Sequence, residues 1–201
     1  GPVFLQGDHF QVSMSHFIQD SSAEMKRIEN LISEAIDAHF LNIDIDASTL
    51  VDLSKQSIID QQKMNSHVTA QLTKFIRAHE NSANNISIGG EIGHIGDKNS
   101  SVEDFETFMS LYLKEIPQNG LSKVSVQTGS SHGGKVKADG SLEKMNIDFS
   151  ILENIGGLAK KKYGLAGAVQ HGASTLELSD FQKFPKHNTA EVHLATGLQN
   201  I

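Results

Sequence analysis

The sequence predicts an α/β fold in which parallel strands alternate with helices, arranged as a (β/α)8 TIM barrel. Six short apolar stretches of strand type alternate with segments of helical periodicity along the 201 residues. Polar residues follow nearly every apolar stretch. In a barrel the carboxyl ends of the strands meet on one face, whereas a doubly wound sheet spreads them along a line. The polar strand ends therefore favour the barrel over the doubly wound alternative.

The predicted elements follow one another in a regular order. The expected strands are residues 3–6, 40–46, 86–91, 123–128, 166–171 and 191–196. The expected helices are residues 21–36, 61–79, 100–112, 148–162 with an interruption at Gly156-Gly157, and 178–184. Capping-box patterns, Ser21 with Glu24 and Ser100 with Glu103, begin two of these helices. A full barrel has eight strands in about 250 residues, so we expect residues 1–201 to form one barrel domain that lacks the first two strands.

The composition narrows the classes of site and partner. The formal net charge is −7, which argues against general binding to nucleic acid. There is no Cys, so a transition-metal site must use His, Asp or Glu. No apolar run approaches the roughly 18 residues of a membrane span, and no signal-peptide pattern opens the chain. We therefore expect a cytoplasmic protein without a membrane partner.

Three of the ten histidines stand beside small residues at predicted strand ends. His9 follows Gly7-Asp8, His132 lies in the segment 128–134, and His171 opens the segment 171–174. Three imidazoles from separate strands of one barrel face can bind Zn²⁺ and leave one position open for substrate. The adjacent glycines leave backbone N–H groups accessible to an anion. The alternative is that these glycines only form tight turns between strands and helices.

Five segments carry a resemblance to a known family. In chain order they are Gly7-Asp8-His9, Gly89–Gly93, Thr128–Gly133, His171–Ser174 and Glu191–Thr196. Together they resemble the signature segments of class II fructose-bisphosphate and tagatose-bisphosphate aldolases, and the resemblance runs from Val3 to the carboxyl terminus. It implies a zinc-dependent lyase of carbohydrate metabolism, as in glycolysis, that is commonly a homo-oligomer. The implied substrate is a ketose bisphosphate, cleaved to dihydroxyacetone phosphate and an aldehyde such as glyceraldehyde 3-phosphate.

The resemblance also implies a role for each matching residue. His9, His132 and His171 correspond to the zinc ligands, and Glu91 corresponds to a carboxylate that can bind the metal when it shifts. Asp8 corresponds to the acid/base at the oxygen on the carbon where the bond breaks. The residues expected around the substrate phosphate are Gly133, Gly172, Ser174, His193 and Thr196. Zn²⁺ would polarise the ketone and stabilise the enediolate as a Lewis acid, and members of the family also use a monovalent cation near the phosphate.

Three departures from the family pattern leave other functions open. His193 stands where the family usually has an Asn that contacts substrate, and Gly197 stands where an Asp is common. The loop Gly96–Ser100 lacks the glutamate that transfers a proton at the enediolate carbon. These differences admit a branch that acts on another phosphorylated ketose. A zinc-dependent barrel hydrolase and an inactive barrel with a structural or assembly role also stay open.

Polar residues within the predicted strands have two interpretations. Asp44 and Asp46 share one face of their strand because side chains alternate with period two. They either point into the barrel as site residues or form a polar layer bonded to neighbouring strands. Gln127 and Gln170 are expected to form hydrogen bonds that support the site.

Overall fold

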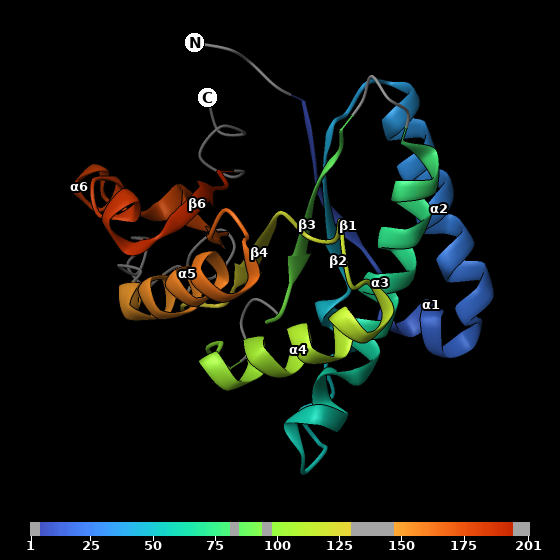
Figure 1. Ribbon diagram of the computed structural model, residues 1–201, viewed down its shortest axis with the longest axis horizontal. Coiled ribbons are helices and arrows are strands. Elements are labelled where there is room, and N and C mark those ends of the chain that lie inside the picture. The colour runs from blue at the N-terminus through green and yellow to red at the C-terminus, as the bar shows by residue number, and fades with distance from the viewer. Residues whose placement is uncertain (1–4, 81–84, 94–97, 130–146, 195–201) are drawn as a thin grey trace, which may run out of the picture. The chain divides into compact units, whose positions relative to one another are not determined.

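A computed structural model describes residues 5–80, 85–93, 98–129 and 147–194 (Figure 1). The chain divides into two compact units. The first unit comprises Gly1–Ile92 and Glu106–Ser122, and the second comprises Gly93–Phe105 and Lys123–Ile201. Within the described ranges, each unit contains three parallel strands and its own buried apolar core.

The first unit is built on the parallel strands β1 (Gln6–Gln11), β2 (Asn42–Asp46) and β3 (Ser87–Glu91), paired in that order. Its helical elements are α1 (Met14–Gln19), α2 (Ser21–Asp37), the 3-10 turn η1 (Ser48–Leu50) and α3 (Ile58–His79). Helix α4 (Val102–Glu115) contributes its residues from Glu106 onward to this unit. Helix α2 packs against β1 and helix α3 packs against β2 (Figure 1).

Strand β2 shows how the sequence divides the two faces of this sheet. Ile43 and Ile45 are fully buried, and the alternation of side chains places Asp44 and Asp46 on the opposite face. The helices supply further buried apolar side chains, namely Ile28, Ile32, Leu72 and Ile76. The apolar face therefore belongs to the core between sheet and helices, and the carboxylate face is left for the candidate site.

The second unit is built on β4 (Lys123–Val126), β5 (Ala168–Gln170) and β6 (Thr189–Val192), again parallel and paired in order. Its helical elements are α5 (Phe149–Tyr163), η2 (Ala173–Thr175), α6 (Leu178–Phe181) and η3 (Phe184–His187). Helix α5 packs against β5 and η3. Within the described residues, none of the helices has the length and apolarity that a membrane span requires.

These elements confirm the predicted α/β class, with six strands in the expected order. Two strand boundaries differ from the prediction in ways that affect the site. Strand β1 continues to Gln11, so Asp8 and His9 lie inside the strand rather than at its end. Strand β6 runs from Thr189 to Val192, so His193 follows the strand directly instead of lying within it.

The predicted break at Gly156-Gly157 is wrong, because α5 is continuous from Phe149 to Tyr163. A Cβ atom on Gly156 would lie 2.5 Å from the carbonyl oxygen of Asn188 and 3.2 Å from the backbone nitrogen of Ala168. The glycine therefore permits close approach between the helix and neighbouring backbone. The helix instead ends at Gly164, which takes the left-handed conformation typical of a C-terminal cap.

The two predicted capping boxes are each displaced by one residue. Asp20, not Ser21, is the N-cap of α2, and its carboxylate accepts a hydrogen bond from the Ala23 N–H. At α4 the reciprocal pair is Ser101 with Asp104, because each side chain bonds the other residue's backbone N–H. Short polar side chains at adjacent positions can each cap the helix, and the sequence pattern alone does not determine which of them does so.

Candidate active site

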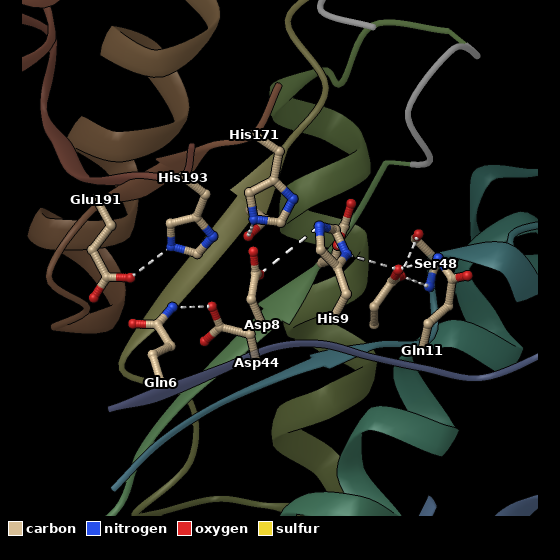
Figure 2. A network of polar contacts seen from close by, with 12 residues as sticks. Gln6, Asp8, His9, Gln11, Asp44, Ser48, His171, Glu191 and His193 are labelled. Carbon is tan, nitrogen blue, oxygen red and sulfur yellow. Dashed lines mark hydrogen bonds and ion pairs between the residues drawn. The ribbon is translucent and has the colours of Figure 1, made fainter. Parts of the chain in front are cut away.

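A β-bulge in β1 sets the geometry of the site in the first unit. Gly7 is opposite Ile43 and Phe10 is opposite Ile45, so Asp8 and His9 together face the single residue between these partners on β2. His9 has a φ of 55°, a left-handed conformation that is uncommon for a residue with a side chain. The bulge interrupts the usual alternation of side chains along the strand. Asp8 and His9 therefore project from the same side of β1, and Asp8 Oδ1 lies 3.8 Å from His9 Nε2 (Figure 2).

His9 lies against two carboxylates that end the next two strands. Its Nδ1 is 3.2 Å from Asp46 Oδ2 and 3.5 Å from Glu91 Oε2. Asp46 also accepts hydrogen bonds from Gln11 Nε2 at 2.6 Å and from the Ser48 hydroxyl at 2.6 Å (Figure 2). Asp46 and Glu91 are 2% and 4% exposed, so both carboxylates are held in a largely dry environment.

The two carboxyl groups have opposite pKa shifts. Burial alone would raise the pKa of Asp46, but hydrogen bonds from His9, Ser48 and Gln11 outweigh it and lower that pKa to about 2. Burial raises the pKa of Glu91 well above its ordinary value, and the negative charges of Asp46, Asp8 and Asp44 raise it further. The surroundings therefore favour the charged form of Asp46 and disfavour the charged form of Glu91.

This donor set fits a divalent metal ion. His9, Asp46 and Glu91 can each offer one ligand atom, and these atoms all lie within 4.8 Å of one another. One imidazole nitrogen and two carboxylate oxygens are ligands that Zn²⁺ accepts in proteins without thiolates. A bound cation would also offset the negative charges that, together with burial, raise the pKa of Glu91.

Asp44 belongs to the same face and is bonded to the neighbouring strand. Gln6 Nε2 on β1 donates to Asp44 Oδ2 at 2.7 Å, and Gln11 donates to Asp46 in the same way (Figure 2). The interpretation of these aspartates as a polar layer bonded between strands is therefore confirmed. Asp46 is in addition part of the metal-compatible group, a role that the sequence did not predict.

In the second unit, His171 follows β5 directly, as predicted, and is buried with 3% exposure. Its Nε2 lies 3.2 Å from the Ser125 hydroxyl on β4. The His193 ring stacks on the His171 ring with centroids 4.6 Å apart and an interplanar angle of 22°. His193 Nε2 in turn contacts Glu191 Oε2 at 3.0 Å (Figure 2).

The chain turns sharply at a glycine directly after His171. Gly172 has a φ of 69°, and η2, which contains Ser174, begins directly after it. The amide of Gln170 donates to the His171 carbonyl, and its side-chain oxygen accepts from the Thr128 hydroxyl at 2.8 Å. Gln127 accepts from the backbone N–H groups of Thr128 and Gly129. Both glutamines thus form the supporting hydrogen bonds predicted for them.

Several predicted residues lie outside the described ranges, namely His132, Gly133, Gly197 and Thr196. Part of the loop Gly96–Ser100 lies outside them as well. Of the acidic residues after that loop, Asp104 bonds the Ser101 backbone and pairs with Lys98 at 3.2 Å, as expected of a residue that serves the first turn of a helix.

A sequence model of the family described as "Fructose-bisphosphate aldolase class-II" matches residues 1–201, which is the whole chain. The chain belongs to this family. Among solved structures, this class II aldolase family member is similar to a chain from Coccidioides immitis assigned as a fructose-1,6-bisphosphate aldolase, with 20% identity and a TM-score of 0.55. The similarity covers 82% of this chain and 52% of that chain, so the present chain spans about half the length of the solved structure. No curated protein matched.

Sequence reasoning missed three residues that the structure places among the polar networks of this class II aldolase family member. Asp46 was recognised as a strand-end residue but not as a partner of His9 and Glu91. Lys123 and Glu191 were placed only as strand residues. A signal was present for Asp46 and Lys123, because a charged residue among apolar neighbours in a strand that is buried on both faces needs a partner. Glu191 lies in a partly exposed strand and carried no such signal.

Proposed function

We propose that the chain acts as a metal-dependent aldolase that breaks or forms a carbon–carbon bond in a phosphorylated ketose. The reaction is cleavage of a ketose bisphosphate to dihydroxyacetone phosphate and an aldehyde, or the reverse condensation. One observation carries the proposal: in a chain matched throughout by the class II aldolase family, the β1 bulge presents Asp8 and His9 together beside Glu91. One short segment of β1 thus supplies both the proposed proton-transferring carboxylate, Asp8, and an imidazole that can bind a metal ion, His9.

The metal in this proposal is Zn²⁺, bound by His9, His132 and His171, with Glu91 as a further carboxylate ligand. The donor chemistry of His9 and its carboxylate neighbours supports a divalent cation, and the absence of Cys from the sequence excludes thiolate ligands. When bound, such an ion supplies Lewis acidity at the ketone oxygen. A monovalent cation near the phosphate belongs to the same proposal.

Asp8 is the proposed acid/base. Its side chain is 38% exposed, so it can reach a substrate, whereas Asp46 and Glu91 are buried. During cleavage the carboxylate takes the proton from the hydroxyl on the carbon where the bond breaks, and during condensation it returns that proton. The bulge makes this role compatible with His9 as a ligand, because adjacent residues of a regular strand would face opposite sides.

The proposed phosphate site uses backbone N–H groups at Gly133 and Gly172, the hydroxyls of Ser174 and Thr196, and His193. The left-handed Gly172 supports this assignment, because turns of this kind direct successive N–H groups to one side. The complete fold that we propose is the (β/α)8 barrel predicted from the sequence. Self-association and a cytoplasmic location stay predictions.

A coupled assay tests the proposal directly. The purified chain is given a panel of ketose bisphosphates, and release of dihydroxyacetone phosphate is measured with Zn²⁺, with a chelator, and after Zn²⁺ is restored. We expect cleavage of at least one member of the panel, lost with the chelator and recovered with the metal. Chelator-resistant cleavage would contradict the metal-dependent mechanism, and zinc-loaded protein that cleaves no member of the panel would contradict the aldolase activity.

A further inference from the structure

The buried face of helix α3 carries polar side chains at positions where an amphipathic helix usually has apolar ones. Three of them, Gln62, Asn65 and Thr69, are 2%, 0% and 0% exposed, and their spacing places them on one side of the helix. A buried amide without hydrogen-bond partners would destabilise the fold. These side chains therefore need specific partners, and the partners of both amides include the end of β3.

The two amides donate to consecutive backbone carbonyls at the carboxyl end of β3. Asn65 Nδ2 donates to the Glu91 carbonyl at 2.9 Å, and Gln62 Nε2 donates to the Ile92 carbonyl at 3.2 Å. The pairing of β2 with β3 reaches Gly90, so the bonds from α3 begin at the next residue. Glu91 and Ile92 are 4% and 1% exposed, and each bond thus satisfies a carbonyl in a buried segment.

Hydrogen bonds along α3 determine how both amides are oriented. The Thr69 hydroxyl donates to Asn65 Oδ1 at 3.4 Å, and Asn65 Nδ2 also donates to Gln62 Oε1 at 3.3 Å. In each amide the oxygen accepts from a neighbour on the helix, which leaves the NH2 group to face β3. Hydrogen bonds in such a chain polarise one another, so the three side chains support one another's bonds.

The anchored backbone carries the carboxylate that faces His9. Glu91 Oε2 lies 3.5 Å from His9 Nδ1, and these two residues with Asp46 can offer ligand atoms that all lie within 4.8 Å of one another. A metal site requires its ligand distances to be correct to within about 0.2 Å. A shift of the Glu91 backbone moves its carboxylate as well. The bonds from α3 therefore help to set the distance between this carboxylate and the other ligands.

We propose that Asn65 and Gln62 are positioning residues that hold the end of β3 so that the Glu91 carboxylate can bind the metal ion. They act through the backbone of Glu91 and Ile92 and make no contact with the metal themselves. The inference rests on the proposed function in one respect, namely that Glu91 is a metal ligand. Groups that orient a metal ligand typically contribute a factor of about 10–100 to metal affinity, which sets the size of the expected effect.

The test measures the affinity of the purified chain for Zn²⁺ by competition with a chelating dye, and the visible spectrum of the Co²⁺ form, which reports coordination geometry. Asn65→Leu removes the donor to the Glu91 carbonyl at similar volume, and Gln62→Met removes the donor to the Ile92 carbonyl. We expect Asn65→Leu to weaken Zn²⁺ binding about 10–100-fold and to change the Co²⁺ spectrum. Gln62→Met should weaken binding by a smaller factor, because its partner carbonyl lies one residue beyond the ligand.

Ser66→Ala is the matched control for the loss of a buried hydrogen bond. Ser66 is 1% exposed and follows Asn65 on the helix, but its hydroxyl donates to the Phe108 carbonyl on α4 at 3.2 Å. The variant should have a lower free energy of unfolding in urea, while its Zn²⁺ affinity and Co²⁺ spectrum stay as in the wild type. An equal loss of affinity in Ser66→Ala and Asn65→Leu would reflect general destabilisation and would overturn the proposal.

The Glu91→Gln background shows whether the effect passes through Glu91. In this background Asn65→Leu should cause no further loss of Zn²⁺ affinity, because the carboxylate that Asn65 positions is absent. An equal loss in both backgrounds, or wild-type affinity in Asn65→Leu, would overturn the inference alone. A wild-type chain that binds no Zn²⁺ would overturn the metal of the proposed function as well. If Asn65→Leu does not fold, Gln62→Met decides the question, and wild-type affinity in that variant would overturn the inference.

Discussion

Replacement of Asp46 by Asn should destabilise the metal-free chain in a pH-dependent way. The environment in the folded state lowers the pKa of Asp46 from 3.8 to about 2, which corresponds to about 2 kcal/mol of stability. Because the folded-state pKa is the lower one, this contribution is complete above the unfolded-state value. It is lost as the pH falls through the folded-state value. About half of it should be gone near pH 3.

The assay is urea unfolding of both proteins in a chelator, at several values from about pH 7 down to pH 3. The difference in unfolding free energy between wild type and variant should shrink by roughly 1 kcal/mol over that range. The control is Asp52→Asn, because Asp52 accepts from the N–H and hydroxyl of Ser54 as Asp46 does from Ser48. The Ser54 hydrogen bonds lower the pKa of Asp52 as well, but its side chain is 38% exposed, so we expect a smaller change with pH. If the difference in unfolding free energy between wild type and Asp46→Asn does not change with pH, the account of Asp46 ionisation is refuted.

Four further substitutions test the first unit. Asp8→Ala should lower kcat about 10²–10⁴-fold with zinc content kept, whereas His9→Ala should lose zinc and activity together, as measured by metal analysis beside kinetics. Glu91→Gln should stabilise the metal-free chain at neutral pH. The folded state raises the pKa of Glu91, so ionisation of this side chain opposes folding as the pH rises above 4.5. Saturating Zn²⁺ should reverse the order of the melting temperatures of wild type and variant. Gly7→Ala should cost about 1–3 kcal/mol, because its Cβ would lie 2.0 Å from the Phe10 ring; a Gly7→Ala/Phe10→Leu variant should recover part of that loss in urea unfolding.

Local patterns predicted most of the fold. The six strands and the helices between them follow from apolar periodicity, which reports burial directly. The face of β2 that carries Asp44 and Asp46 also follows from it, because alternation along a strand fixes the side on which each residue lies. Caps were displaced by one residue, since several short polar side chains could serve each helix start.

The placement of candidate residues was predicted where they stand at regular strand ends, as Glu91 and His171 do. The bulge that brings Asp8 and His9 together depends on the pairing of β1 with β2, and the alternation rule does not apply inside it. The ion pair of Lys123 with Glu191 joins residues that are 68 positions apart along the chain. Contacts at such a separation are set by strand order and register, which local periodicity does not encode.

The central claim, that this chain activates a phosphorylated ketone with a bound metal, is tested most directly by solvent exchange at carbon. Dihydroxyacetone phosphate is incubated with the zinc-loaded chain in deuterium oxide without an aldehyde, so the result does not depend on which ketose is the substrate. Proton NMR should show loss of one hydrogen from the carbon that forms the new bond, at a rate abolished by a chelator and restored by Zn²⁺. Zinc-loaded chain that leaves this hydrogen in place would contradict the account.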